Sequence, residues 1–280
     1  MNAVVTITEV GWPSYQRSIV ERWRGSEQVR QQDCVAEEVP IALVYNTIPH
    51  VVMLATPLDL EDFALGFSLT EGIVESTTEI KSIRVLNRAE GIEVRMRIPQ
   101  ERFAFLTDKG RNLTGRTGCG LCGAASLRQA VRRPKPVHSG VRVAARELHG
   151  ALEAMRGLQT LNRITGAVHA AAWGLPGEGI QKIREDVGRH NALDKLIGTL
   201  LRTRIEVGAG FIMVTSRASY EMVQKCAAAG IGFMAAISAP TGLAIRLAEE
   251  AGVTLIGFAR DGAHVVYTHP RRLDVASSSA

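Results

Sequence analysis

Two segments of the sequence establish the fold class, Phe211-Ile212-Met213-Val214-Thr215-Ser216 and Gly232-Phe233-Met234-Ala235-Ala236-Ile237-Ser238. Both are short apolar runs, which are typical of strands buried on both faces of a sheet. Helical patterns over 220–229 and 242–251 follow them, and a third apolar run covers 253–259. Alternating strands and helices of this kind predict a layered α/β sheet.

The same alternation extends in both directions from this stretch. Upstream, the pattern predicts a helix over 148–158, strands over 167–173 and 180–187, and an amphipathic helix over 191–201. Downstream, Asp261-Gly262 predicts a turn into a strand over 264–267. We therefore assign residues 146–280 to one layered α/β domain.

A smaller α+β domain is expected over residues 40–145. Strand-like alternation covers 41–45, 51–55, 83–86 and 92–98, with a hairpin turn over 46–50. A buried helix begins after Pro57, with Asp59 as its predicted N-cap. This domain also carries a glycine-rich segment over about 109–124 that we expect to be a mobile loop. Residues 1–39 are polar and poorly periodic, which predicts a loose arm with the option of an added edge strand.

Composition limits the classes of function. The net charge is +5, the pI is near 9.2 and aromatic residues make up only 5% of 280 residues. No basic run is interleaved with aromatic residues, so we expect no nucleic-acid partner. No apolar run is long enough to span a membrane, and the first residues lack a secretory pattern. Four cysteines are too few for a disulfide scaffold of this length, so we expect a cytoplasmic protein with reduced thiols.

Three segments that follow predicted strands carry hydroxyl, glycine and arginine residues. They are Ser216-Arg217-Ala218-Ser219, Ser238-Ala239-Pro240-Thr241-Gly242 and Phe258-Ala259-Arg260-Asp261-Gly262. Ligands of open α/β sheets bind beyond the carboxyl ends of the strands, and helix N-termini there attract anions. The three segments together predict a site for a phosphorylated ligand.

Two cysteines lie within the run Gly115-Arg116-Thr117-Gly118-Cys119-Gly120-Leu121-Cys122-Gly123. Cationic neighbours favour the thiolate, which is the reactive form. A structural zinc site needs about four ligands, and no second cysteine pair exists. A dithiol oxidoreductase motif usually opens a helix, whereas glycines here indicate a loop. The third interpretation is an exposed thiolate that carries sulfur as a persulfide, and the residues alone leave these alternatives open.

The segment Glu185–Lys195 places many polar residues before an apolar helix. One interpretation is a capped, solvated helix start; the other is a ligand contact by Asp186, Arg189, His190 and Asn191. We expect Asp194 and Lys195 at the surface or on a helix face. Charged residues around the first helix are expected to serve only as capping and turn residues, namely Glu61, Asp62 and Glu71.

His169 invites comparison with the zinc deaminases, whose signature is His-x-Glu followed by Pro-Cys-x-x-Cys. Here Ala171 occupies the glutamate position, and the cysteine pair precedes the histidine. Deaminase chemistry therefore lacks its proton shuttle, and we interpret His169 as a core or pocket-lining residue. Cys226 lies in a helical pattern and is expected to be buried.

Taken together, several motifs resemble the FdhD family of formate dehydrogenase accessory sulfurtransferases. They lie in the expected order: Glu61–Phe67, Thr117–Gly123, Thr165-Gly166 with His169-Ala170-Ala171, Glu185–Lys195, Ser216–Glu221 and Ser238–Thr241. The resemblance implies a cytidine-deaminase-like α/β/α fold for the C-terminal domain, without deaminase chemistry. It also implies a homodimer.

The resemblance further implies a sulfurtransferase. Such proteins take persulfide sulfur from a cysteine desulfurase and pass it to the molybdenum cofactor, bis(molybdopterin guanine dinucleotide), which formate dehydrogenase requires. Cys119 would carry the persulfide, with Cys122 as an assistant or second carrier, and no resident metal is expected. The expected cofactor-binding residues are Phe258, Ala259, Arg260, Asp261, Gly262, Ala263, Ser216, Arg217, Ser219, His169, Arg189 and His190. A non-catalytic chaperone of the same cofactor and a dithiol redox protein remain as alternatives.

Overall fold

The computed structural model describes residues 8–9, 11–110, 134–260 and 262–274. Its largest sheet has six strands in the order β11 (Gly179–Asp186), β10 (His169–Leu175), β12 (Phe211–Val214), β13 (Phe233–Ala236), β14 (Thr254–Arg260) and β15 (Ala263–Thr268). Strands β12, β13 and β14 are parallel to one another, and the other neighbouring pairs are antiparallel. The mixed α/β class predicted from the alternating pattern is confirmed.

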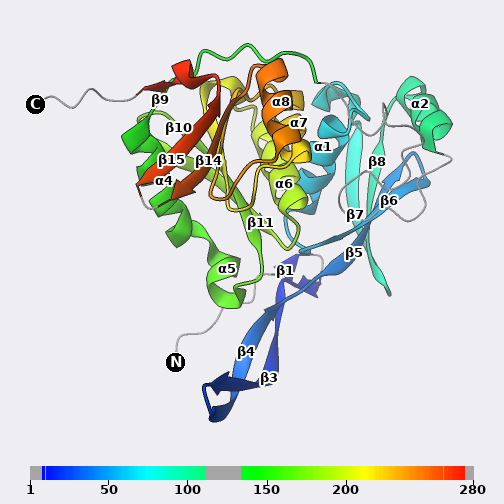
Figure 1. Cartoon of the computed structure of the whole chain (residues 1–280). Coiled ribbons are helices and arrows are strands. Elements are labelled where there is room, and N and C mark those ends of the chain that lie inside the picture. The colour runs from blue at the N-terminus through cyan, green and yellow to red at the C-terminus, as the bar shows by residue number, and fades with distance from the viewer. Residues whose placement is uncertain (1–7, 10, 111–133, 261, 275–280) are drawn as a thin grey trace, which may run out of the picture.

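Helices cover both faces of this sheet (Figure 1). On one face α6 (Arg189–Arg202), α7 (Tyr220–Ala228) and α8 (Gly242–Ala251) pack against Ile212, Val214 and their neighbours. On the other face α4 (Ala145–Leu158) packs against Phe211 and Met213. Side chains of a strand alternate between the two faces, so a strand covered on both sides must be apolar throughout.

The second sheet has four strands in the order β6 (Ile48–Ala55), β5 (Val39–Tyr45), β8 (Gly91–Arg97) and β7 (Ser82–Arg88). Its core packs against α1 (Leu60–Thr70). The predicted hairpin turn is shorter than expected: Asn46 and Thr47 both have positive φ and form a two-residue turn, so β6 already begins at Ile48. Asp59 occupies the predicted N-cap position of α1, but its side chain makes no capping hydrogen bond and pairs with Arg184 instead.

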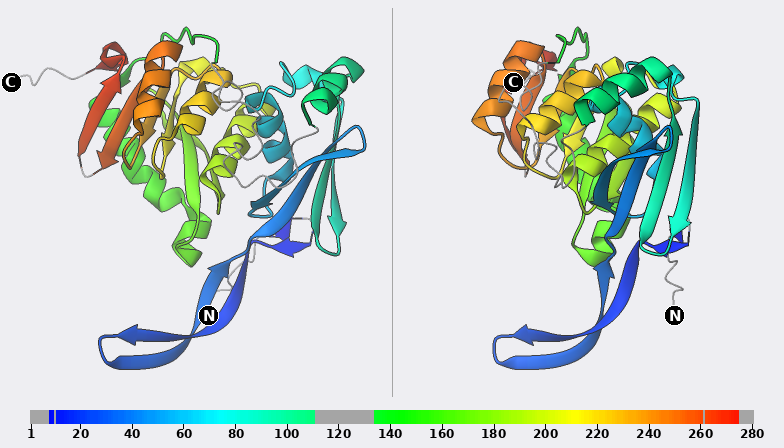
Figure 2. Two further views of the ribbon diagram at one scale, coloured as in Figure 1. Left: turned by 45° about the vertical axis from the view of Figure 1, so that its right-hand side comes forward. Right: turned by 90° about the vertical axis from the view of Figure 1, so that its right-hand side faces the viewer.

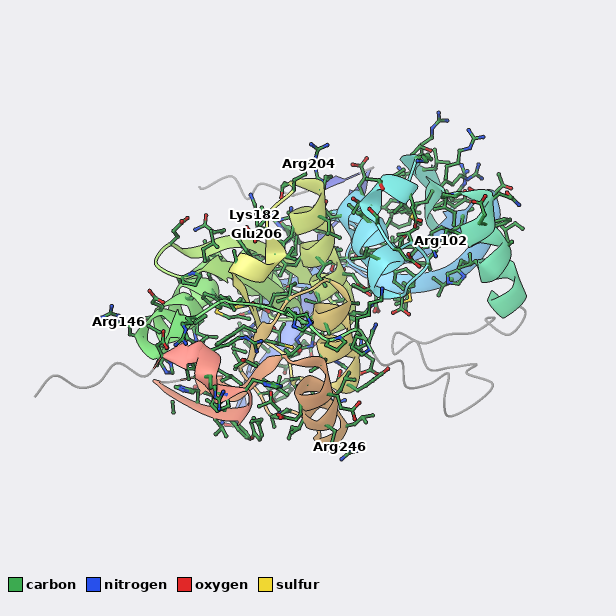
Figure 3. All side chains as sticks on the ribbon, turned by 90° about the horizontal axis from the view of Figure 1, so that it is seen from above. Arg102, Arg146, Lys182, Arg204, Glu206 and Arg246 are labelled. Atoms are coloured by element: carbon green, nitrogen blue, oxygen red, sulfur yellow. The ribbon has the colours of Figure 1, made fainter. Side chains whose placement is uncertain are left out.

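Helix α2 (Gln100–Gly110) follows this sheet and was not expected from the sequence. Arg102, labelled in Figure 3, projects from α2 and forms ion pairs with Glu75 and Glu79. Glu79 belongs to the short helix η1 (Thr77–Glu79), so α2 is tied to the segment that follows α1. A second short helix, α5 (Thr160–Thr165), was also not expected.

The remaining elements are small. Strand β9 (Val143–Ala144) pairs with β16 (Leu273–Asp274), and β1 (Thr8–Glu9) pairs with β2 (Trp12–Pro13). Two further short helices complete the described part, namely η2 (Val207–Ala209) and η3 (Pro270–Arg272). Residues 134–142 have no regular structure, as the prolines predict.

The expectation of a loose N-terminal arm was wrong for the residues described. Strands β3 (Tyr15–Arg24) and β4 (Glu27–Ala36) form an antiparallel hairpin that stands away from the body (Figure 2). The hairpin pairs with neither larger sheet, so it is not an added edge strand. Its base is anchored where Tyr15 packs with Leu161 and Val168.

The two larger sheets meet where α1 crosses α6. A β-carbon on Gly66 of α1 would overlap the Asp194 carbonyl, and one on Gly198 of α6 would overlap the Asp62 carbonyl. Glycine therefore allows the two helix backbones to touch. The proposed domain boundaries at residues 39 and 145 stay a prediction.

Candidate functional site

The three strand-end segments predicted from the sequence lie side by side. The Ala218 amide donates to the Ala239 carbonyl at 3.2 Å, the Thr241 amide donates to the Ala218 carbonyl at 3.1 Å, and the Phe258 amide donates to the Ser238 carbonyl at 3.2 Å. These bonds join the loops that follow β12 and β13 to each other and to the last part of β14. The carboxyl ends of these parallel strands therefore form one continuous edge, which we call the strand-end site.

Three helices begin at this edge. Gly188, Ser219 and Thr241 are the N-cap residues of α6, α7 and α8. The Thr241 hydroxyl accepts a hydrogen bond from the Ala244 amide at 3.3 Å, whereas Ser219 makes no side-chain cap. Helix N-termini carry partial positive charge and free N–H groups, so their convergence favours an anion.

Several buried polar atoms at the edge have no hydrogen-bond partner among the described residues. They are Arg189 Nε, His190 Nε2 and Ser219 Oγ. His190 is only 8% exposed and Ser219 only 6%. A buried polar atom without a partner is costly, and a bound ligand with acceptor oxygens would satisfy such donors.

Glu221 is a site residue whose role the sequence reasoning missed. It lies in the first turn of α7, and its Oε2 is 3.8 Å from His190 Nε2. The His190 side chain lowers the pKa of Glu221 to about 2, so the carboxylate stays ionised at neutral pH. The available signal was an acidic residue in the first turn of the helix after Ser216–Ser219.

His169 begins β10, which is antiparallel to β12, and this places it at the same edge. Its Nδ1 is 3.4 Å from Thr215 Oγ1. Burial lowers the pKa of His169, and the nearby Arg189 and His190 lower it further. His169 is therefore neutral at pH 7 and contributes no cation to the edge.

The last predicted segment offers an exposed aromatic ring. Phe258 has a positive φ of 51° and is 39% exposed, which is unusual for a large apolar residue. Arg260, Gly262, Ala263 and Arg217 are also exposed. Ala259 is fully buried, and the Ser216 hydroxyl donates to the Arg217 carbonyl at 3.0 Å. Cys119, Cys122 and Asp261 lie outside the described residues.

The two remaining cysteines, Cys226 and Cys34, are not part of the strand-end site. Cys226 is buried in α7, as expected, and burial raises the pKa of its thiol to about 12. It is therefore not a nucleophile at neutral pH. Cys34 is partly buried on β4, where it packs against the cluster at the base of the hairpin.

Asp194 and Lys195 are not surface residues; that prediction was wrong. Lys195 is fully buried, and its Nζ lies 2.7 Å from Asp186 Oδ2 and 2.8 Å from the Thr56 carbonyl oxygen. Asp194 accepts hydrogen bonds from Thr70 at 2.7 Å and from Lys225 at 2.9 Å. Lys195 is paired with Asp186 of β11 and Asp194 with Lys225 of α7, and Thr56 and Thr70 add hydrogen bonds from the α1 side, which is why both charges tolerate burial.

Asp62 and Glu71 are likewise more than capping and turn residues. The Asp62 carboxylate accepts from Thr199, Arg184 and Arg202. Burial alone would raise the pKa of Asp62, but these hydrogen bonds together lower it. Glu71 pairs with Lys225 at 2.9 Å. The polar segment Glu185–Lys195 thus has two roles. The side chains of Asp186, Asn191, Asp194 and Lys195 bond to other buried groups of the protein, whereas Arg189 and His190 lie close to His169 of the strand-end site.

Within the part of the chain that the structure describes, no group of three or more histidine, cysteine or carboxylate residues is placed to hold a metal ion. None of the helices in these residues is both long and apolar enough to cross a bilayer.

Comparison with known proteins gives a consistent result. The sequence pattern of the FdhD/NarQ family matches residues 36–274. A protein of Cupriavidus necator named sulfur carrier protein FdhD is 53% identical over 268 residues, which cover 96% of this chain and 93% of that protein. A protein of the same name from Xanthomonas euvesicatoria is 54% identical over 256 residues, 91% of each chain. The crystal structure of a putative formate dehydrogenase accessory protein from Desulfotalea psychrophila aligns with a TM-score of 0.73 at 24% identity, covering 94% of this chain and all of that one.

Proposed function

This chain belongs to the FdhD/NarQ family, and we propose from this premise that it is a sulfur carrier that serves the maturation of formate dehydrogenase. More specifically, it takes sulfur from a cysteine desulfurase and transfers it to a bound molybdenum cofactor, which we call the cargo. The single observation that supports a cargo site is the strand-end site, where Arg189 Nε, His190 Nε2 and Ser219 Oγ lie buried beside three helix starts without a hydrogen-bond partner among the described residues.

Sulfur loading is assigned to Cys119 from the sequence. Its thiolate attacks the outer sulfur of the desulfurase persulfide; a new S–S bond forms at Cys119, and the desulfurase thiolate leaves. Cationic neighbours such as Arg116 favour the attacking thiolate. Among the described cysteines, burial prevents Cys226 from replacing it.

Cargo binding is assigned to the strand-end site. The guanine dinucleotide arms of the cofactor carry phosphates, which match the helix N-termini and the side chains of Arg189, His190, Arg217 and Arg260. The exposed ring of Phe258 is suited to stack on a purine base. No residue is required to bind metal, because molybdenum arrives within the cargo.

The sulfur step is tested by incubating the protein with a desulfurase and cysteine, followed by mass spectrometry of the intact chain. We expect the wild type to gain the mass of one sulfur atom and Cys119→Ala to lose this adduct. Cys34→Ser is the matched control and should load normally. A Cys119→Ala variant that still gained the adduct and still activated formate dehydrogenase would refute the assignment.

A chaperone without sulfur transfer is the second candidate, because the strand-end site by itself fits nucleotide binding. Replacing both Cys119 and Cys122 separates the two functions. Lost activation with retained GDP binding supports the sulfur carrier, whereas retained activation supports the chaperone. If the chain were a dithiol redox protein, it would reduce a model disulfide. We expect no such reduction. The homodimer remains part of the proposal and is tested by light scattering.

A further inference from the structure

The turn that carries Arg189 and His190 is held by one buried carboxylate. Asp186 Oδ1 accepts from the Gly188 amide at 2.7 Å and from Asn191 Nδ2 at 3.0 Å. Asp186 Oδ2 accepts from Lys195 Nζ at 2.7 Å. The carboxylate therefore fixes the chain on both sides of Arg189 and His190, since residues 186–188 precede them and Asn191 follows.

The same turn is bonded to a residue about 130 positions away. Thr56 lies between β6 and α1 and is fully buried. Its amide donates to Asp186 Oδ2 at 3.0 Å, its hydroxyl accepts from the Val187 amide at 3.1 Å, and its carbonyl accepts from Lys195 at 2.8 Å. Thr56 thus bonds to this turn through its amide and its hydroxyl, and its carbonyl holds Lys195, the cation that pairs with Asp186.

We propose that Thr56 and Lys195 are positioning residues for the strand-end site, because through Asp186 they fix the turn that presents Arg189 and His190 to the cargo. The inference rests on the cargo site proposed above. It makes anion binding depend on the contact between the four-stranded and six-stranded sheets. Neither residue touches the cargo: both are completely buried at the contact of α1 with α6.

Thr56→Val tests the proposal with little change in volume. The valine loses the acceptor for the Val187 amide, whereas Thr56→Ser retains it. Thr268→Val is the matched control, since the Thr268 hydroxyl accepts from the Leu255 amide at 3.0 Å and Thr268 is also buried. Thr268 pairs with Leu255 at the start of β14, which is the opposite end of the sheet from the strand-end site.

Two measurements are made on all three variants. The first is hydrogen exchange of the amides over residues 186–191, which needs no ligand. We expect faster exchange in Thr56→Val and wild-type exchange in Thr56→Ser and Thr268→Val. The second is the Kd for GDP as a probe of the cargo site. We expect a rise of about tenfold in Thr56→Val, which corresponds to the loss of one buried hydrogen bond, and less than about twofold in the other two variants.

Unchanged exchange over 186–191 in Thr56→Val overturns the positioning role, whatever the affinity. Equal losses of GDP affinity in Thr56→Val and Thr268→Val also overturn it, since they indicate only lower stability. If the wild type does not bind GDP, the proposed nucleotide site fails, while the exchange data still decide whether Thr56 fixes the turn.

Discussion

Gly198 of α6 lies so close to Asp62 of α1 that a β-carbon on the glycine would overlap the Asp62 carbonyl group. A second contact of this kind has the glycine on the other helix: a β-carbon on Gly66 of α1 would overlap the Asp194 carbonyl group of α6. Around these contacts lie the buried ion pairs Lys195–Asp186 and Lys225–Asp194 and the cluster around Asp62. The contact of the two sheets therefore depends on backbone proximity as well as on charge.

We expect Gly198→Ala to destabilise the protein by about 1–3 kcal/mol or more, because one backbone must move away from the other. Urea unfolding measures the loss. Gly150→Ala is the control. Gly150 lies within α4, and no atom of the described residues lies within 4 Å of a β-carbon built there, so alanine should stabilise the helix by about 0.5–1 kcal/mol. Equal effects at both positions would contradict the close packing.

Lys195→Met should cost about 3–5 kcal/mol, because it leaves the Asp186 carboxylate buried without its cation. The control is Arg22→Met, which breaks the exposed pair with Asp33 at 3.7 Å and should cost less than about 1 kcal/mol. Chemical denaturation of the two variants provides the comparison. A small loss of unfolding free energy in Lys195→Met would mean that the buried ion pair contributes little to stability.

The stability contributed by Glu221 should depend on pH. Its pKa in the folded state is about 2, below the ordinary value of 4.5, so the ionised form stabilises the fold above pH 4.5. That contribution is lost as the pH falls toward 2. We expect Glu221→Gln to be less stable than the wild type by about 1–3 kcal/mol at pH 7, and the difference to shrink between pH 5 and 3.

Thermal unfolding across this pH range checks the Glu221 prediction, with Glu178→Gln as the control in an exposed turn. A pH-independent difference for Glu221→Gln would show that its interaction with His190 is not electrostatic.

Cys226 should resist alkylation in the folded protein, because burial raises the pKa of its thiol to about 12 and blocks access. Iodoacetamide labelling followed by peptide mass spectrometry should modify Cys226 only after urea is added. Cys34, which is partly exposed, should react without urea and serves as the internal control. Rapid labelling of Cys226 in the native state would reopen it as a candidate sulfur carrier.

The six-stranded sheet could be predicted because each central strand is an unbroken apolar run. A short run of this kind is typical of a strand that is buried on both faces of a sheet. Because β12, β13 and β14 are parallel, the segments at their carboxyl ends lie at the same edge of the sheet. The hairpin of β3 and β4 could not be predicted in the same way. Its strands bury neither face along most of their length, with Ile19 and Trp23 both 61% exposed, so no alternating apolar pattern marks them.

The burial of Asp194 and Lys195 was equally hidden from sequence reasoning. A charged residue near a helix start is usually solvated, and its pairing with a distant partner is decided by the fold. The Thr70 hydroxyl that binds Asp194 is 124 positions away, and the Thr56 carbonyl that binds Lys195 is 139 positions away. Only the crossing of α1 and α6 brings these groups together.

That crossing also constrains how the sulfur transfer proposed above can work. The two helices touch through their backbones and are flanked by buried ion pairs, so the strand-end site and the four-stranded sheet are held together as one packed unit. A sulfur atom that passes from its donor to its acceptor must then be carried by parts of the chain outside the contact of α1 with α6.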